Sequence, residues 1–457
     1  MSPQPCDTIV FGGSLLDVAD AGSASDDMAV AIAGTDIVAV GTSEQVRSNW
    51  SATTEIDARR GVIAPGFVDA HVHLSAFLAA AMTYTPPSGA GRFSGGSNVR
   101  EIVPFIAQMT SMTLPAELTS TVLRPVFAAM LASGITSVVD AGSSGHDGIV
   151  QAANDVGIRA AIGPSLADCW HDDTGSIGRR VDHRQLLDVA EAWLSDNVPG
   201  SGLVRGLVSA VETIACSDEL LAGIAQLAEK FDVPTNIHSH ITEASDQAHL
   251  VAYGRSATDR LSESGMLSER CVAMHVGNAN SADVDAFVGA GVTVNHNPLG
   301  NAMLGFATSP QRAIPAMIDA GIPIVLGSDY APSMIATPFD SMHAALAMHR
   351  EAVGADNALT LEQVIAMSTN AGVAVGRPGR LGRLGVGNLA DIVVIDTSGS
   401  HHLGDRHPIP STALRARSDD IRVVIVNGRT VVENGRVTSI NERAALDEAQ
   451  ALLSTMR

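Results

Sequence analysis

The sequence predicts an α/β fold: a (β/α)8 TIM barrel with a small β-sandwich built from the two ends of the chain. Short β-branched runs alternate with longer segments of helical periodicity through the middle of the chain. Short alternating apolar runs separated by turn residues occur near both termini. We therefore expect a composite β-sandwich domain from residues 1–65 and 376–457, and a barrel domain from residues 66–375.

The composition is that of a globular protein that handles small molecules. The chain has 457 residues, of which 46% are hydrophobic and 17% are charged, so it can bury a large core. Its formal net charge of -21 repels phosphate backbones and anionic bilayers, so we expect a small-molecule substrate and neither nucleic acid nor membrane as a partner.

The expected location is the cytoplasm. The start of the chain lacks a basic segment followed by an apolar core, and no apolar run reaches the roughly 20 residues that span a bilayer. The four cysteines are scattered and form no CxxC pair, which favours a reducing compartment and excludes a thiolate zinc cluster.

The terminal segments are predicted to pair with each other. The runs "TIVFGG", "MAVAIAG" and "DIVAVG" near the start resemble short antiparallel strands, and so do "ADIVVID", "IRVVIVNG" and "RTVVENGRVT" near the end. Because each set is too small to bury its own apolar face, we expect both to share one small sandwich.

Eight strands are predicted for the barrel. They lie near residues 66–73, 136–140, 158–162, 204–213, 234–240, 271–275, 292–296 and 323–329. Two insertions, "PPSGAGRFSGGSN" at 86–98 and "GPSLADCWHDDTGSIG" at 163–178, follow the first and third strands. Both are candidate pocket loops, because barrel enzymes place their active sites above the strand C-termini; plain surface excursions are the alternative.

Polar residues suited to catalysis gather at the predicted strand ends. His71 and His73 are two apart and so project from one face of the first strand. The fifth strand ends with His240, and Glu243 follows it; later strands end with His275, with His296 and Asn297, and with Asp329. Neutral imidazoles and a carboxylate suit Zn²⁺, or alternatively Fe²⁺, and such an ion lowers the pKa of water from about 15.7 toward roughly 7.

These motifs resemble the amidohydrolase superfamily, in particular the branch with cytosine deaminase, the triazine hydrolases and the S-adenosylhomocysteine deaminases. The resemblance rests on "IAPGFVDAHVHL", "HITE", "HNPLGNAMLG", "GSDYAPS" and "GRLGVGNLADIVVID", and it covers nearly the whole chain. It implies one divalent metal ion held by His71, His73, His240 and Asp329. It further implies that Asp329 takes a proton from water, that Glu243 protonates a substrate nitrogen and that His275 polarises the reacting group. The resemblance also implies a homo-oligomer.

Lys230 is the only lysine, so no lysine can bridge two metals at the fourth strand; Glu212 is a carboxylate that could do so. His238 is either a partner of the ligands or a barrel-interior histidine. His296 and Asn297 are predicted to contact substrate, with a helix cap as the alternative. Trp170 is a candidate pocket residue or a loop anchor.

Another group, His401, His402 and His407, is expected to be solvated.

The predicted activity is hydrolytic deamination, or dechlorination, of an N-heterocyclic small molecule by an activated water. The alternative on the same metal site is cleavage of an amide, urea or carbamate C–N bond, in which Glu243 would protonate the leaving amine. A barrel that has lost its chemistry is disfavoured, because every proposed ligand and both proton-transfer residues are present.

Overall fold

The structure is a computed structural model. It describes residues 3–16, 26–75, 77–78, 115–171, 177–197, 202–306, 313–329, 336–354, 359–404 and 407–455. The predicted pocket loop at residues 86–98 lies outside the described residues. Among the described helices, none is long and apolar enough to cross a membrane.

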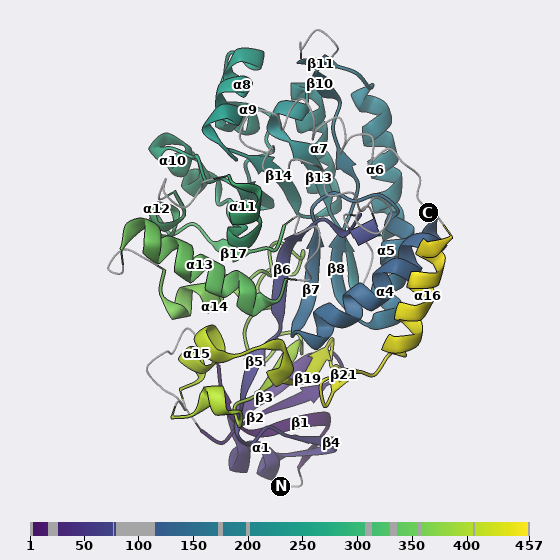
Figure 1. Cartoon of the computed structure of the whole chain (residues 1–457), viewed down its shortest axis with the longest axis vertical. Helices are drawn as coiled ribbons and strands as arrows, with labels where there is room; N and C mark the ends of the chain where they lie inside the picture. Colours follow the sequence, from purple (N-terminus) through teal and green to yellow (C-terminus); the bar gives the residue numbers. More distant parts are fainter. Residues whose placement is uncertain are drawn as a thin grey trace.

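Strands from both ends of the chain form one nine-stranded sheet, in the order β21-β20-β19-β18-β5-β1-β2-β3 with β4 beside β1. Figure 1 shows these strands gathered at one end of the molecule. Their common junction is the antiparallel pair β5–β18, which brings Ile63 opposite Val394. The members are β1 (Gln4–Leu15), β2 (Met28–Ala33), β3 (Asp36–Thr42), β4 (Trp50–Asp57), β5 (Gly61–Pro65), β18 (Ile392–Asp396), β19 (Ile421–Val426), β20 (Arg429–Glu433) and β21 (Arg436–Val437).

The middle of the chain has a TIM-barrel-like α/β arrangement whose strands pair in parallel. The hydrogen-bonded strands fall into two sheets, ordered β12-β8-β7-β6 and β17-β16-β15-β14-β13-β9. Every predicted barrel strand has a counterpart: β6 (Phe67–Val72), β7 (Ile135–Asp140), β8 (Arg159–Ile162), β12 (Val204–Gly206) with β13 (Val208–Glu212), β14 (Thr235–Ser239), β15 (Cys271–His275), β16 (Thr293–His296) and β17 (Ile324–Leu326). A short strand, β9 (Ser165–Leu166), continues from β8.

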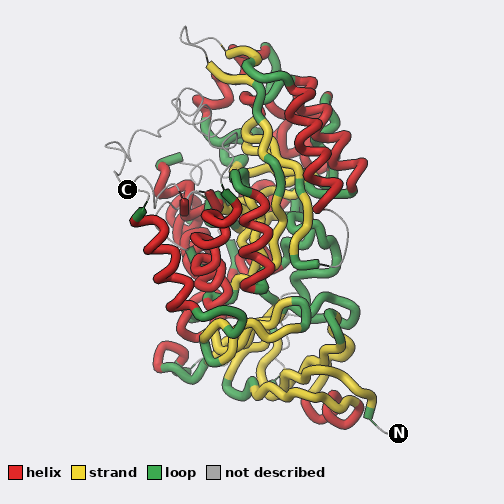
Figure 2. Tube along the Cα trace, turned by 90° about the vertical axis from the view of Figure 1, so that its right-hand side faces the viewer, coloured by secondary structure: helices red, strands yellow, loops and turns green. Residues whose placement is uncertain are grey.

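Helices follow the strands and cover them, as Figure 2 shows for the strands in the centre of the molecule. Several begin at a side-chain cap; Thr242, for example, accepts a hydrogen bond from the backbone of Ser245. The helices of this region are α4 (Ala116–Ala132), α5 (His146–Val156), α6 (His183–Asn197), α7 (Asp218–Phe231), α8 (Glu243–Tyr253), α9 (Ala257–Glu263), α10 (Ser281–Ala290), α11 (Pro298–Leu304), α12 (Ala313–Asp319), α13 (Pro338–Val353) and α14 (Leu361–Thr369). Helix α1 (Ser43–Asn49) belongs to the terminal sheet.

The C-terminal helix α16 (Glu442–Ser454) packs beside α4 and not on the terminal sheet (Figure 1). An ion pair between Arg124 and Glu448 joins the two helices. The final segment of the chain therefore contributes to the outer helical layer of the central region.

Candidate metal centre

Three predicted ligands meet at the C-terminal ends of β6 and β17. The Nε2 atoms of His71 and His73 lie 3.3 and 3.5 Å from Oδ1 of Asp329. His71 and Asp329 are buried, and the side chain of His73 is 13% exposed, so one side of the group is accessible. The ligand atoms of the three residues lie within 4.8 Å of one another, close enough to share one ion.

Hydrogen bonds join the ends of β6 and β17 next to His71, His73 and Asp329. The backbone N–H of Asp329 donates to the carbonyl of His71 at 2.8 Å. The buried Asp69 carboxylate accepts hydrogen bonds from the backbone N–H of Ser328 at 2.9 Å and from its hydroxyl at 2.6 Å. This second layer fixes the carboxylate of Asp329 relative to the two histidines.

His238 joins the group from β14. Its ring lies 4.9 Å from that of His71 and 5.4 Å from that of His275, measured between centroids. The Nδ1 atom lies 2.6 Å from the carbonyl oxygen of Val211. Because a carbonyl only accepts, Nδ1 carries the proton, and the lone pair of Nε2 is free to bind a metal. His71, His238 and His275 form a second set whose ligand atoms lie within 4.8 Å.

The structure differs from the prediction at His240. Strand β14 ends at Ser239, and His240 takes a left-handed backbone conformation with a φ of 48°, so the two-residue alternation that would align it with His238 stops. Its Nε2 lies 2.9 Å from the hydroxyl of Thr258 and its Nδ1 lies 3.1 Å from Asp246.

Nε2 of His240 is therefore hydrogen-bonded outside the cluster, and Nδ1 faces Asp246. The Thr258 hydroxyl donates to Asp283 and so accepts from Nε2 of His240. Burial acts to lower the pKa of His240, but the hydrogen bond and charge of Asp246, together with Asp283, outweigh it and raise the pKa. The possible metal-ligand groups of the described residues accordingly include His238 and not His240.

His275 faces Asp329 from the end of β15. Its Nε2 lies 4.0 Å from Oδ2 of Asp329, and its Nδ1 lies 2.7 Å from Oδ1 of Asn301. The amide oxygen accepts, so Nδ1 carries the proton and Nε2 points its lone pair at the cluster. His275 and Asp329 both have positive φ, 68° and 64°, a conformation that costs of order 1–3 kcal/mol and is concentrated at functional sites.

Electrostatics keep the ligands in their metal-binding states. Burial lowers the pKa of His71 to about 4 and holds that of His238 well below its usual range. Burial alone would raise the pKa of Asp329, but the electrostatic interaction with His275 and the contacts of His71 and His73 hold the pKa well below its usual range. At neutral pH His71 and His238 are therefore neutral imidazoles, and Asp329 is an ionised carboxylate.

Two glycines allow the cluster to pack this closely. A Cβ atom at Gly300 would lie 2.6 Å from Oδ2 of Asp329. A Cβ atom at Gly327 would lie 2.5 Å from both Cβ of His71 and Oδ1 of Asn297. The motifs "HNPLGN" and "GSD" thus place small residues on either side of the ligands.

The predicted substrate contacts His296 and Asn297 lie in the same interior. Both are buried, and the amide nitrogen and oxygen of Asn297 have no hydrogen-bond partner among the described residues. The Nε2 atom of His296 lies 3.0 Å from Nε2 of His349 on α13. Asn297 begins α11 without a side-chain cap, which leaves its amide available for another partner.

Comparison with known proteins assigns the family. The model of the amidohydrolase family matches residues 62–431. The chain belongs to the amidohydrolase family. It is 29% identical over 465 residues to the 5-methylthioadenosine/S-adenosylhomocysteine deaminase of Syntrophobacter fumaroxidans, with 100% of both chains covered. It is 28% identical over 408 residues to the 5'-deoxyadenosine deaminase of Methanosarcina mazei, covering 89% of each chain.

Solved structures share the fold of this amidohydrolase. A zinc-bound adenosine deaminase from Xanthomonas campestris has a TM-score of 0.86 and 20% identity, over 100% of this chain and 99% of that one. A zinc complex of atrazine chlorohydrolase from Arthrobacter aurescens has a TM-score of 0.84 and 23% identity, over 98% of this chain and 100% of that one.

The remaining predicted site residues lie on α8, on a hairpin after β9 and at the end of β13. Glu243 is the first residue of α8, and its side chain is exposed. Trp170 lies on the hairpin β10 (Cys169–His171) and β11 (Ile177–Arg179), and it packs against Val211 and its apolar neighbours. Burial, with a further contribution from Asp246, raises the pKa of Glu212 to about 8. Glu212 is in none of the possible metal-ligand groups of the described residues.

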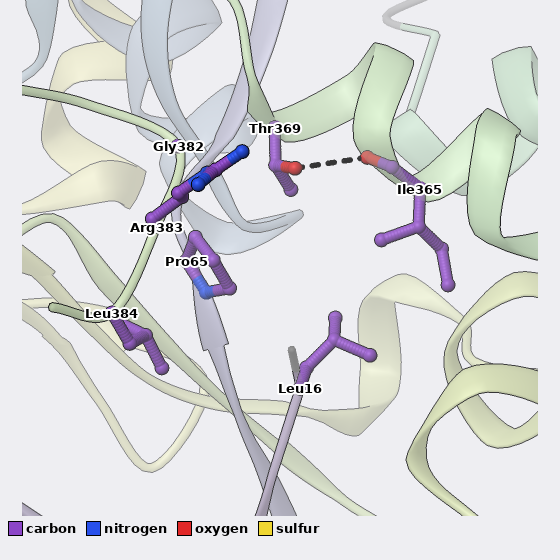
Figure 3. A pocket seen from close by; sticks show the side chains of 7 residues that line it. All are labelled: Leu16, Pro65, Ile365, Thr369, Gly382, Arg383 and Leu384. Carbon is purple, nitrogen blue, oxygen red and sulfur yellow. Dashed lines mark hydrogen bonds between the residues drawn. The ribbon is translucent and has the colours of Figure 1, made fainter. Parts of the chain in front are cut away.

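A small hollow lies at the opposite end of β6 (Figure 3). Its lining includes Pro65, which precedes β6, whereas His71 lies near the C-terminal end of that strand. The hydroxyl of Thr369 in its lining donates to the carbonyl of Ile365 within α14. This hollow has no part in the chemistry of the cluster.

Four residues that position this amidohydrolase cluster were missed by the sequence analysis: Asp69, Asn301, Ser328 and His349. Asp69 and Ser328 stand two residues before His71 and one before Asp329, inside the quoted motifs. That adjacency was a usable signal. The contact between His349 and His296 joins residues that are 53 positions apart, so no local sequence pattern could predict it.

Proposed function

We propose that this amidohydrolase is a zinc-dependent hydrolytic deaminase that acts on the exocyclic amine of an N-heteroaromatic substrate, a 6-aminopurine nucleoside above all. The observation that carries the proposal is the convergence of His71, His73, His238, His275 and Asp329 at the C-terminal ends of four strands. The full-length similarity to deaminases of adenine nucleosides supports the substrate class.

The residues fit one divalent cation, Zn²⁺ ahead of Fe²⁺. Both ring nitrogens of His71 and Oδ2 of Asp329 are buried without a hydrogen-bond partner among the described residues. Leaving such groups unsatisfied costs about 1–3 kcal/mol each, which a shared cation would offset. We propose His71, His73, His238 and Asp329 as ligands. The family resemblance gives the place of His238 to His240, the histidine three residues before Glu243, and the two assignments are separated experimentally below.

Different residues of the chain can then carry out the separate proton transfers of deamination. When bound, the cation supplies Lewis-acid activation of water. Asp329 accepts a proton from the attacking water, and its depressed pKa agrees with a group that is ionised before the reaction. Nε2 of His275 accepts a hydrogen bond from the nucleophile and orients it.

Glu243 donates a proton to the ring nitrogen beside the attacked carbon. Its place at the start of α8, directly after the strand that carries His238, suits this role. Asp329 passes the proton taken from water to the exocyclic amine, which leaves as ammonia while the ring stays intact. His296 and Asn297 are the proposed substrate contacts, and the unpartnered amide of Asn297 supports that role. Trp170 is proposed to line the entrance.

Three further proposals concern the closure of the barrel, the division into domains, and the location and assembly of the protein. We propose that the two parallel sheets are parts of one closed (β/α)8 barrel, because the bridge between Val72 and Asp329 joins β6 to the end of β17. We propose a domain division at residues 65 and 375, with the nine-stranded terminal sheet folded as a sandwich. A cytoplasmic homo-oligomer is proposed from composition and family resemblance.

An assay of ammonia release, with metal analysis of the same sample, tests the proposed function. Candidate substrates are adenosine, 5'-deoxyadenosine, methylthioadenosine, S-adenosylhomocysteine, cytosine, guanine and the triazines. About one zinc per chain and ammonia from a purine nucleoside with its ring intact is the expected result. Cleavage of an amide or carbamate to an acid and an amine would instead favour the alternative hydrolase.

The Asp329→Asn and Glu243→Gln variants test the two proposed proton-transfer residues. Both should fold and both should lose ammonia release, because each removes a proton-transfer group without changing side-chain size. Persistent turnover by Asp329→Asn would contradict the assigned site.

A further inference from the structure

A second group of metal-ligating side chains lies at the terminal sheet, far along the chain from the catalytic cluster. His401 and His402 lie in the 3-10 turn Ser400–His402, and Asp420 ends the 3-10 turn Ser418–Asp420 before β19. The expectation that these histidines are solvated is wrong for His402, whose side chain is 0% exposed. The ligand atoms of the three residues lie within 4.8 Å of one another.

The two imidazoles present the same nitrogen to the same carboxylate. Nε2 of His401 lies 2.9 Å and Nε2 of His402 lies 3.3 Å from Oδ2 of Asp420. Ligand atoms bound at 2.0–2.1 Å in a tetrahedral zinc site are separated by about 3.3 Å. The two nitrogen-to-oxygen separations are close to this value, and the two Nε2 atoms lie within 4.8 Å of each other.

Without a bound ion, several hydrogen-bond donors face the Asp420 carboxylate. Oδ2 of Asp420 also accepts the backbone N–H of Arg417 at 2.8 Å, and Nε2 of His401 lies 3.1 Å from Oδ1 as well, so three donors converge on this one carboxylate. The other ring nitrogen of His402, Nδ1, is buried with no hydrogen-bond partner among the described residues. A cation bound by the two Nε2 lone pairs and by Asp420 would relieve the competition, since the carboxylate could then keep the Arg417 hydrogen bond.

The surroundings hold the ligands in place and leave one side open. Nη1 of Arg415 donates to the carbonyls of His401 and Leu403, which fixes the turn that carries both histidines. The side chain of Asp420 is 9% exposed and that of His401 is 26% exposed, so an ion can enter from the side of His401 and keep a water as its fourth ligand.

We propose that His401, His402 and Asp420 form a second zinc site, which joins the turn after β18 to the turn before β19. Two imidazoles and one carboxylate are ligands that Zn²⁺ accepts readily, whereas Mg²⁺ and Ca²⁺ prefer oxygen ligands alone. Such a cross-link stabilises the terminal sheet and takes no part in turnover.

Zinc content of the whole enzyme, equilibrated with free Zn²⁺ and then passed through gel filtration, tests the second site. About two zinc ions per chain are expected for the native sequence and about one for His401→Ala, with unchanged turnover. His401 is partly exposed, so this variant should fold; His402→Ala is the second test variant. Asp419→Asn is the matched control, because Asp419 is an exposed carboxylate beside Asp420, and it should keep both ions.

A barrel variant separates this proposal from the proposed function. His71→Ala should lose the catalytic ion and keep the second one. The second site is overturned if the native enzyme holds a single ion, or if His401→Ala keeps as much zinc as the native chain. In a companion melting experiment, added zinc should raise the unfolding temperature of His71→Ala but no longer raise that of the double variant His71→Ala/His401→Ala.

Discussion

Nδ1 of His238 lies 2.6 Å from the carbonyl oxygen of Val211, across the neighbouring strands β14 and β13. This contact decides which ring nitrogen of His238 carries the proton, and it turns the other toward His71. His240 has no equivalent freedom, because Thr258 and Asp246 occupy its ring nitrogens. The two histidines are thus distinguished by the partners of their ring nitrogens and by the end of β14, which lies between them.

The first prediction follows from these partners. His238→Ala should reduce the metal content from about one ion per chain at the barrel to nearly none. Turnover should fall by more than the roughly 10- to 100-fold that loss of an orienting partner costs. Metal analysis at limiting zinc, with circular dichroism to check folding, measures both effects.

His240→Asn is the comparison variant, and it should retain the metal. The opposite result, with metal lost from His240→Asn and kept by His238→Ala, would mean that the chain after β14 rearranges when the ion binds. It would return the ligand role to the histidine that the family resemblance selects.

A second prediction concerns Gly300. An alanine there would push its Cβ to within 2.6 Å of Oδ2 of Asp329, a distance that forces the carboxylate to move. We expect Gly300→Ala to weaken zinc binding by roughly 10- to 100-fold and to destabilise the protein by about 1–3 kcal/mol. Competition with a chelator measures the first effect and denaturant unfolding the second.

Gly289→Ala is the matched control for that substitution. Gly289 lies in α10, where an added Cβ atom would meet nothing within 4 Å. The substitution should leave zinc affinity unchanged. Equal zinc affinities for Gly300→Ala and the native chain would show that Asp329 can shift without loss.

Much of the fold could be predicted because its signals are local. Strand-forming runs and turn residues predicted the eight barrel strands but not the short parallel strand β9, and the two-residue strand period placed His71 and His73 on one face. The same period did not predict the orientation of His240, because β14 ends at Ser239. The positive φ of His240 is rare for a residue other than glycine, and no sequence pattern marked it.

Contacts between distant segments were also beyond prediction. His402 is buried because its turn packs against Asp420, which lies 18 residues further along the chain. Isolated from that contact, a polar "SHH" segment has the composition of an exposed loop. The insertion after the third strand was interpreted either as a pocket loop or as a surface excursion, and it places Trp170 on a short hairpin that packs against Val211 and its apolar neighbours.

A third prediction concerns pH and Glu212. Burial raises the pKa of this carboxyl from 4.5 to about 8, so the folded state binds a proton that the unfolded state releases. The contribution of the protonated Glu212 to the free energy of unfolding is therefore fully present below pH 4.5. It is lost as pH rises through about 8, and the loss is on the order of 4 kcal/mol. Glu212→Gln cannot ionise and should not show this loss.

Denaturant unfolding at acid and at alkaline pH measures the difference between Glu212→Gln and the native chain. The glutamine variant should gain stability relative to the native chain as pH rises across this window. Glu229→Gln, at an exposed position of α7, should follow the native curve. If Glu212→Gln also follows it, Glu212 is ionised in the fold and bound to a cation, as a bridge to a second metal would require.

A fourth prediction addresses the junction between the central strands and the terminal sheet. Arg159, at the start of β8, forms a two-point ion pair with Asp391, with Nε–Oδ2 and Nη2–Oδ1 distances of 2.9 Å. Both side chains are 2% exposed, and Asp391 also accepts the backbone N–H of Asn427. Arg159→Met should cost about 3–5 kcal/mol, because it leaves a buried carboxylate without its counter-charge.

The double variant Arg159→Met/Asp391→Asn tests that reason. Removing the orphaned charge should restore part of the lost stability, whereas loss of packing alone would make the two changes additive. Turnover per folded molecule should remain unchanged in both variants, because Arg159 lies at the end of its strand opposite the metal ligands. A loss of zinc from Arg159→Met would instead mean that the junction helps to hold the catalytic strand ends in place.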